Sequence, residues 1–578
     1  MNQDKHIPKS VRIFENKNVW ITLLKTMLPQ MLIALMSGLY LLVNQVMMNK
    51  IIPFDGVHDN EHIWKNYKEI TDIWNQLCWK SGRKLPLETA NEIIRSANAI
   101  SLPVIITLSS IALWPSMGIA VMYGSNIGKR QTNEANKIWT SSLLPTFLFC
   151  LIITIVIAAL DYTWMYNTSG ASQSESLSFI DNNLMDQNKT NTLSPEIQNL
   201  LKDFYKTYYQ EIVRYSFEFT LPIILAVFLW TFVMTATFCL NSEGKQIATL
   251  IFSISCNVLN IFFDFVLMKF GKLGMLSGGL GVSITLLINA LILVAYLAYL
   301  NKRSATLMTL NFSKYPKTDW MIFASNLIIG LSSFLRNISS ALTILLYQQF
   351  LLKITISIGT DTPTYWLNFS GATMPIYNLL FNTALGIVRA MRMLFAYHLS
   401  AKNITYVKKS FLIGTLYSII ISAFLFVVIA NQTIGLKLMS GLFDLEIDNS
   451  SIARDAVFYL QIILSNIILC GLTMASMTFF QVGGRTLLAS ATAILSGIGF
   501  APIIYSIFNA LAIQQKNETI YIYSWLANGI IAGITIFLIT VIHIFVYVKA
   551  DYEINDPIKK IKNWLKKKLQ KKNIVIQP

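Results

Sequence analysis

The chain has 578 residues, of which 54% are hydrophobic and only 13% are charged. Average soluble domains carry roughly 25% charged residues, so this composition argues against a soluble enzyme. The net charge of +16 comes from basic residues that lie between and after long apolar segments, which points to membrane topology and away from nucleic acid. The five cysteines are scattered and form no Cys-x-x-Cys pair, so we expect neither a disulfide framework nor a zinc site.

Long apolar segments recur along the whole chain. A helix of about 20 apolar residues is enough to cross the hydrocarbon core of a bilayer. The sequence therefore predicts an all-α polytopic membrane protein with twelve transmembrane helices. The predicted limits of the spans are residues 19–49, 101–127, 137–160, 214–240, 247–268, 274–300, 320–352, 373–397, 411–430, 455–481, 487–510 and 522–548. The first apolar run is too long for the core of a signal peptide, so we expect it to remain as a span.

The distribution of Lys and Arg predicts the orientation in the membrane. If both termini lie in the cytoplasm, the inner loops and the tail carry more Lys and Arg than the short outer loops. Long connections are translocated largely regardless of their charge, so they weigh little in this comparison. We therefore expect a multi-pass protein of the plasma membrane with both termini in the cytoplasm.

Two segments outside the spans have the pattern of amphipathic helices. In the long outer connection 50–100, apolar residues recur at helical spacing from Ile63 to Leu77, which predicts a helix on the outer interface. The tail, residues 549–578, mixes apolar residues with many Lys residues and predicts a basic helix that binds anionic lipids of the inner leaflet. A positive-inside bias carried to the terminus is an equally good explanation of the tail.

The second long outer connection, residues 161–213, is predicted to be mostly irregular. Residues 161–192 are polar and are expected to form a solvated loop. Near its end, Ser194-Pro195-Glu196 has the form of a helix start, with a capping residue, a Pro at the first helical position and an acid in the first turn. The simplest interpretation is that both outer connections are extracellular additions without a role in transport.

Two short patterns occur twice, which indicates an internal duplication. The first pattern is Gly128-Lys129-Arg130, which recurs as Ala401-Lys402-Asn403. The second runs from Thr235 to Lys245 and recurs from Ala475 to Arg485. Many transporters consist of two related bundles with the substrate between them.

The duplication predicts the domain organisation. We expect two six-helix bundles related by a pseudo-two-fold axis, an N-terminal lobe of residues 1–300 and a C-terminal lobe of residues 301–548. If the lobes are repeats, Gly244 should occupy the same structural position as Gly484.

The ordered motifs resemble those of the multidrug and toxic compound extrusion (MATE) family. The resemblance covers nearly every span and rests on Gly128-Lys129-Arg130, on the turn Ser242-Glu243-Gly244-Lys245, on Asn260-x-x-x-Asp264 and on Ala396-Tyr397-His398-Leu399-Ser400-Ala401-Lys402-Asn403. It implies a cation-coupled antiporter, driven by H⁺ or Na⁺, that exports amphipathic and mainly cationic organic compounds by alternating access. It also implies a monomer without enzymatic activity, resident cofactor or bound nucleic acid.

Asp264 is the main candidate for the coupling site because it is the only carboxylate well inside a predicted span. A charged group at that depth is costly and by default marks function. Asn260 lies four residues earlier, on the same face of the helix. Asp264 can carry a proton or, with the Asn260 oxygen, bind Na⁺, and the sequence does not choose between these ions. The alternative is a neutral Asp that holds two helices together.

The resemblance adds further candidate ligands for a cation at Asp264. It implies a hydroxyl from span 6, and the register allows either Thr285 or Ser283. Where many relatives carry an Asp in span 1, this chain has Asn44, so it departs from the two-carboxylate pattern of those relatives. No other metal site is expected.

The C-terminal lobe carries arginines in place of an obvious carboxylate. Arg336, followed by Asn337, lies inside span 7 and marks a second polar site, or else helps to hold helices together. Arg389 and Arg392 lie near the inner end of span 8 and are expected to extend toward the lipid headgroups.

Two other classes of function are alternatives. A flippase for lipids or lipid-linked oligosaccharides, from the same broader superfamily, would have Arg336, Arg389 or Arg392 facing a central cavity. A lipid-modifying enzyme would need acidic or His ligands clustered near one membrane face, and the sequence lacks them. There is also no nucleotide-binding loop, so we expect an ion gradient to supply the energy.

Overall fold

A computed structural model describes residues 9–55, 90–184, 199, 212–309, 319–358, 365–443 and 450–547. Within these ranges every regular element is a helix, which confirms the all-α fold. Eleven of the described helices are long and apolar enough to cross a membrane, and the number is twelve if one bent pair forms a single span. The predicted helix at 63–77, the helix start at Ser194 and the tail 549–578 lie outside the described residues.

The first half of the chain supplies the helices of the predicted N-terminal lobe. They are η1 (Lys9–Glu15), α1 (Val19–Asp55), α3 (Ala90–Gly128), α4 (Thr132–Leu184), the bent pair of Ile212–Leu225 and α6 (Val227–Ser242), α7 (Gln246–Lys269) and α8 (Leu276–Lys302).

The second half supplies the helices of the predicted C-terminal lobe. They are α9 (Trp320–Ile358), α10 (Tyr365–Ser400), α11 (Ile404–Ile429), α12 (Gln432–Phe443), α13 (Ser450–Ser465), α14 (Ile467–Val482), α15 (Thr486–Ile494), η3 (Leu495–Gly499), α16 (Ala501–Gln515), α17 (Thr519–Ile542) and η4 (His543–Tyr547).

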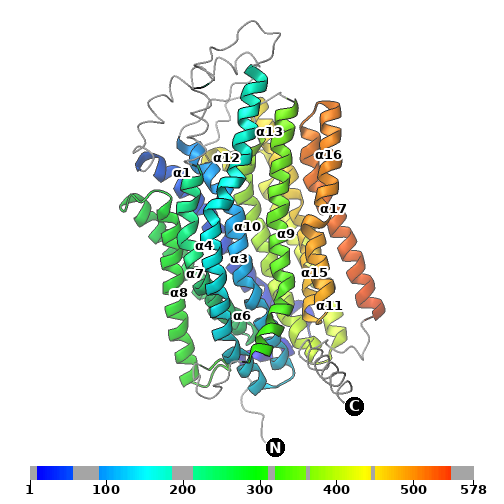
Figure 1. Ribbon diagram of the computed structural model, residues 1–578. Coiled ribbons are helices and arrows are strands. Elements are labelled where there is room, and N and C mark those ends of the chain that lie inside the picture. The colour runs from blue at the N-terminus through cyan, green and yellow to red at the C-terminus, as the bar shows by residue number, and fades with distance from the viewer. Residues whose placement is uncertain are drawn as a thin grey trace, which may run out of the picture.

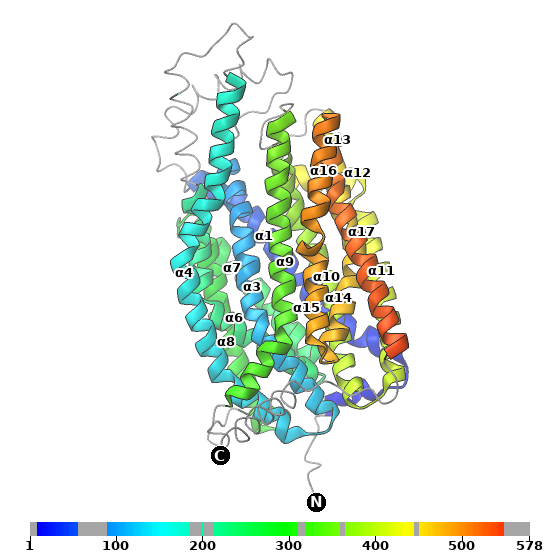
Figure 2. The same ribbon diagram turned by 45° about the vertical axis from the view of Figure 1, so that its right-hand side comes forward.

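The long helices run side by side along one direction, as Figures 1 and 2 show. In Figure 1, α7 and α8 lie at one edge, α16 and α17 lie at the other, and α3, α9 and α10 lie between them. The two halves meet where α1 packs on α10 and where α3 packs on α9 and α10. Many large apolar side chains of α4, α7, α11 and α17 point outward, as expected for surfaces that contact lipid.

The helices α3 and α9 approach closely at Gly118. A methyl group at residue 118 would lie 1.8 Å from the carbonyl oxygen of Asn326, so only a glycine permits this contact between the halves. Trp114, one turn earlier on α3, donates from Nε1 to the carbonyl oxygen of Leu327 at 2.7 Å. The halves are therefore tightly joined along this part of the interface.

The backbone has similar turns at the positions of the duplicated motifs. Gly244 and Gly484 follow the fourth and tenth spans in turns with positive φ angles of 79° and 70°. Each of these spans is also interrupted by one non-helical residue, Ala226 in the first half and Asn466 in the second. Ala226 precedes Gly244 by the same number of positions as Asn466 precedes Gly484. The spacing from the interrupted helix to the glycine turn is therefore the same in both halves.

The first repeated motif has a slightly different register from the predicted one. Arg130 and Lys402 both have a φ of 58°, and each lies in the turn between two spans. The amide of Gln131 donates to Asn126, and the amide of Asn403 donates to His398 in the same way. The backbone thus pairs Arg130 with Lys402, whereas the sequence match aligned the Lys residues of the two motifs and was displaced by one position.

The predicted solvated loop at 161–192 is wrong over its first part. Residues 161–184 are helical because α4 continues to Leu184, and Figures 1 and 2 show it projecting beyond its neighbours. Extending an existing helix needs no new nucleus, so polar residues can follow an apolar span in helical form. The connection between the ninth and tenth predicted spans contains α12, and the eleventh span is interrupted by the π-helical turn η3.

Candidate functional site

Asp264 lies on the face of α7 that packs against α8, and its side chain is 0% exposed. The carboxyl fits there because residue 281 of α8 is a glycine. A methyl group at that position would lie 1.7 Å from Oδ1 of Asp264. Among the described residues, neither carboxylate oxygen of Asp264 has a hydrogen-bond partner.

Helix α1 brings two more polar residues to the same place. Asn44 donates from Nδ2 to the hydroxyl of Tyr40 at 3.2 Å. Tyr40 also interacts with Asp264 and with Asn260, so it connects three of the predicted site residues. Sequence reasoning missed Tyr40, although its position one helical turn before Asn44 was a usable signal.

The structure distinguishes the two candidate hydroxyls of span 6. Thr285 is buried one turn after Gly281, on the face of α8 that meets Asp264. The Ser283 hydroxyl instead lies 2.7 Å from the carbonyl oxygen of Pro222 and 2.9 Å from that of Gly279. Thr285 is therefore better placed than Ser283 to face the carboxyl.

The cluster around Asp264 is rich in oxygen atoms that lack partners. Within the described part of the chain this holds for the side-chain oxygens of Asp264, Asn260, Asn44 and Thr285. Buried polar atoms are almost always hydrogen-bonded, so several exceptions in one place require an explanation. Carboxylate, amide and hydroxyl oxygens are the ligands that hard cations prefer. This group, with Tyr40, is called the Asp264 cluster below.

Arg336 of α9 is buried, with an exposed fraction of 7%. Its Nε and Nη2 atoms donate to the Oδ1 atom of Asn337 at 3.2 Å and 2.9 Å. Its Nη1 atom has no partner among the residues that the structure describes. The predicted polar pair of the second lobe therefore exists, but it leaves part of the guanidinium free.

Arg389 and Arg392 of α10 do not extend toward the headgroups, so that prediction is wrong. Both line a cavity between the halves, opposite Gln30 of α1 and Asn241 of α6. Arg392 is only 7% exposed, and the Arg389 guanidinium carbon lies 5.9 Å from the centre of the Phe238 ring. Because α10 is surrounded by other helices, side chains this far from its end remain between the lobes.

The three arginines lie within electrostatic range of one another. Arg389 acts on Arg336, and both act on Arg392. The ion pairs found in the described ranges involve other residues. The interface between the halves therefore carries a concentration of buried positive charge, which is called the arginine cluster below.

One end of the first half is held together around Glu243, which is 0% exposed. Its Oε1 atom accepts hydrogen bonds from the Tyr123 hydroxyl at 2.6 Å, the Thr306 hydroxyl at 2.9 Å and the Leu307 amide at 2.8 Å. Its Oε2 atom pairs with Lys245. The last turn of α6 is thus tied to α3 and to the segment after α8.

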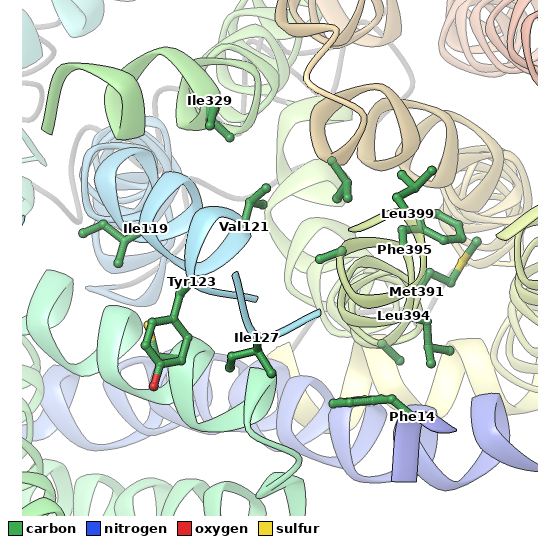
Figure 3. Close-up of a cluster of buried hydrophobic side chains, with 14 of the residues drawn as sticks. Phe14, Ile119, Val121, Tyr123, Ile127, Ile329, Met391, Leu394, Phe395 and Leu399 are labelled. Carbon is green, nitrogen blue, oxygen red and sulfur yellow. The ribbon is translucent and has the colours of Figure 1, made fainter. Parts of the chain in front are cut away.

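Helix η1 lies across the same end and contacts both halves. The Ser10 hydroxyl donates to the carbonyl oxygen of Glu243, and the Tyr397 hydroxyl of α10 donates to Glu15 at 3.1 Å. Phe14 is buried, with its ring centre 5.6 Å from that of Tyr397. Figure 3 shows Phe14 in one core with residues of α3 and α10, on the side where Ile127 lies.

Comparison with curated proteins finds relatives of about the same length. The chain is 24% identical over 552 residues to an uncharacterized protein of Mycoplasma pneumoniae, covering 94% of this chain and 95% of that one. It is 23% identical over 558 residues to an uncharacterized protein of Mycoplasma genitalium, covering 96% and 97% of the two chains. No protein-family model matches the chain.

Comparison with solved structures identifies the fold. The outward-facing conformation of a multidrug resistance MATE family transporter of the MOP superfamily matches with a TM-score of 0.64 at 15% identity, covering 93% of this chain and 98% of that one. A MOP superfamily transporter from Pyrococcus furiosus, whose pocket is described as having reverse polarity, matches with a TM-score of 0.63 at 15% identity and the same coverage. The chain therefore has the fold of the MATE transporters of the MOP superfamily, as its motifs predicted.

Proposed function

We propose that the chain is a secondary transporter that moves amphipathic organic compounds across the membrane by alternating access, coupled to a cation bound at Asp264. The observation that carries the proposal is the Asp264 cluster, where a carboxylate and three neutral side chains present buried oxygens without partners among the described residues. A bound Na⁺ or a proton would compensate the buried charge. In this role Asp264 holds the ion, and Asn260, Asn44 and Thr285 offer neutral oxygens.

An ion gradient can supply the energy for this transport. Moving one charge through the membrane potential yields about 2.3 kcal/mol per 100 mV, in addition to the concentration term. The cation would bind when the Asp264 cluster is open to one side and leave when it is open to the other.

The interface between the halves supports alternating access as the mode of movement. The contacts of η1 with α6 and α10, and the contact at Gly118, close the interface over part of its length. In the proposed cycle the two lobes rock, so that these contacts separate while the other end closes. We propose that the protein does this as a monomer in the plasma membrane, with both termini in the cytoplasm and the tail on anionic lipids.

The arginine cluster favours a second candidate function, movement of lipids or lipid-linked compounds between the two leaflets. A flippase must accommodate charged headgroups inside the membrane, and Arg336, Arg389 and Arg392 supply positive charge there. Both candidates are secondary transport on the same fold, and they differ in the compound that moves.

The coupling proposal is tested with Asp264→Asn, which keeps the size of the side chain and removes its charge. The purified chain is reconstituted in liposomes with an imposed proton gradient or, separately, a sodium gradient, and uptake of a lipophilic cation dye and of an alkyl phosphate is measured. The wild type should respond to one gradient and Asp264→Asn to neither. Asn260→Ala should lose less of the response to the gradient than Asp264→Asn, because it removes only one neutral ligand.

The matched control is Asp319→Asn, which makes the same chemical change at the start of α9, where Asp319 pairs with Lys137 at 3.5 Å. It should behave as the wild type, because Asn also caps a helix. Undiminished ion dependence in Asp264→Asn would show that Asp264 is a structural residue and that coupling occurs elsewhere.

A further inference from the structure

The second half of the chain encloses a cavity that the coupling site does not use. It lies between α9, α10, α14, η3 and α17. Its apolar wall includes Phe381, Leu469 and Met474. The cavity therefore offers an apolar surface to an organic group.

Two buried hydrogen-bond donors line this cavity without a partner in the described ranges. One is Nη1 of Arg336, and the other is Nε1 of Trp525, which is also buried. A guanidinium keeps its positive charge at any ordinary pH, and an indole nitrogen can only donate. Both donors therefore require an acceptor, and an anion in the cavity would supply acceptor oxygens.

The charge around the cavity also favours an anionic ligand. Arg389 and Arg392 line the cavity between the halves, and they interact electrostatically with Arg336. No carboxylate of the described chain lines either cavity. The three like charges around these cavities would repel a cationic compound and attract an anionic one.

We propose that the cavity at Arg336 and Trp525 binds the anionic head of an amphipathic substrate, a phosphate group that carries an apolar chain. The proposal rests on the proposed transport function and names its substrate class. Arg336 and Trp525 hold the head, and Phe381, Leu469 and Met474 contact the apolar chain. Arg389 and Arg392 attract the head at the interface between the lobes. This assignment replaces the cationic substrates that the family resemblance implied.

Binding to the purified full-length chain in a neutral detergent is the first test. The probes are dodecyl phosphate and dodecyltrimethylammonium, which have the same apolar chain and opposite head charges, and binding is read from intrinsic tryptophan fluorescence and from calorimetry. The wild type should bind the phosphate at least tenfold more tightly. Equal binding of the two probes, or tighter binding of the ammonium compound, would overturn the proposal.

Variants test whether the phosphate compound binds in this cavity. Arg336→Gln should weaken phosphate binding by about tenfold to a hundredfold, the range of a charge-assisted hydrogen bond, and leave ammonium binding unweakened. Trp525→Phe removes only the indole donor and should weaken phosphate binding less. The control is Arg454→Gln, which removes an exposed arginine of α13. If Arg336→Gln and Trp525→Phe both bind as Arg454→Gln does, the anion is bound elsewhere and the proposal fails.

A phosphate head can belong to a membrane lipid or to a free amphiphile, and transport distinguishes these sources. Liposomes are prepared with fluorescent phosphatidylglycerol in one leaflet or with dodecyl phosphate outside. If the lipid moves between the leaflets faster with the wild type than with Arg336→Gln, the substrate is a membrane lipid. If only the uptake of dodecyl phosphate is faster, the substrate is a free amphiphile. If neither moves faster with the wild type than with Arg336→Gln, the cavity does not serve transport of this substrate class and the proposal is overturned.

The failures of the two proposals can be told apart. Gradient-driven movement of the cation dye without phosphate binding would leave the coupling function standing and refute the anionic substrate. Phosphate binding and transport that ignore every imposed gradient would refute the coupling at Asp264 and support the anionic substrate.

Discussion

Helix η1 should control access to one end of the interface, and Phe14→Ala tests this. The Phe14 side chain is 1% exposed and packs in a core that contains Ile127 of α3 and Leu394 of α10. Truncating a buried Phe to Ala typically costs about 3–5 kcal/mol. If this loss falls mainly on the docking of η1, the equilibrium between docked and undocked η1 shifts by a hundredfold to a few thousandfold, since about 1.4 kcal/mol corresponds to a factor of ten.

Hydrogen–deuterium exchange of the purified chain, followed by mass spectrometry of peptides that contain residues 9–15, measures this shift. The amides of η1 should exchange at least tenfold faster in Phe14→Ala than in the wild type. The ends of α3 and α10 should also lose protection, because η1 covers them. Transport should change as well, because the state closed at this end becomes less populated.

The control is Phe270→Ala, which makes the same truncation at a side chain that is 71% exposed at the end of α7. It should leave the exchange of η1 as in the wild type. If η1 exchanges at the same rate in Phe14→Ala as in Phe270→Ala, the polar contacts of Ser10 and Glu15 hold η1 in place and the reasoning from apolar burial is refuted.

Two further substitutions test the buried carboxylates. Glu243→Gln keeps an acceptor oxygen but exchanges charged hydrogen bonds for neutral ones at a cost of about 1 kcal/mol each, so it should lower the thermal unfolding midpoint. The partly exposed Glu218→Gln should not lower it. Equal midpoints for the two variants would contradict this role of Glu243. Gly281→Ala places a methyl group against the Asp264 carboxyl and should abolish the response to an ion gradient, whereas Gly371→Ala, with nothing within 4 Å, should transport as the wild type does. A retained response in Gly281→Ala would show that the carboxyl can move away without loss of coupling.

The sequence alone determined the features that depend on local pattern. Apolar length determined the spans, because crossing a bilayer requires about 20 apolar residues whatever the neighbouring helices are. Asp264 was identified because a lone carboxylate in an apolar run is conspicuous without any structure. The repeat at Gly244 and Gly484 was visible because the same turn needs the same residue with positive φ.

Only the tertiary structure decided which residues meet. No local pattern indicated that Arg389 and Arg392 lie between the lobes, because side chains near a helix end reach the headgroups unless other helices surround them, and α10 is surrounded. Nor did any pattern indicate that Trp525 of α17 and Arg336 of α9, which are distant in the sequence, line one cavity. Such contacts depend on how helices pack across the two halves, and the period of apolar residues along one helix contains no information about its partner.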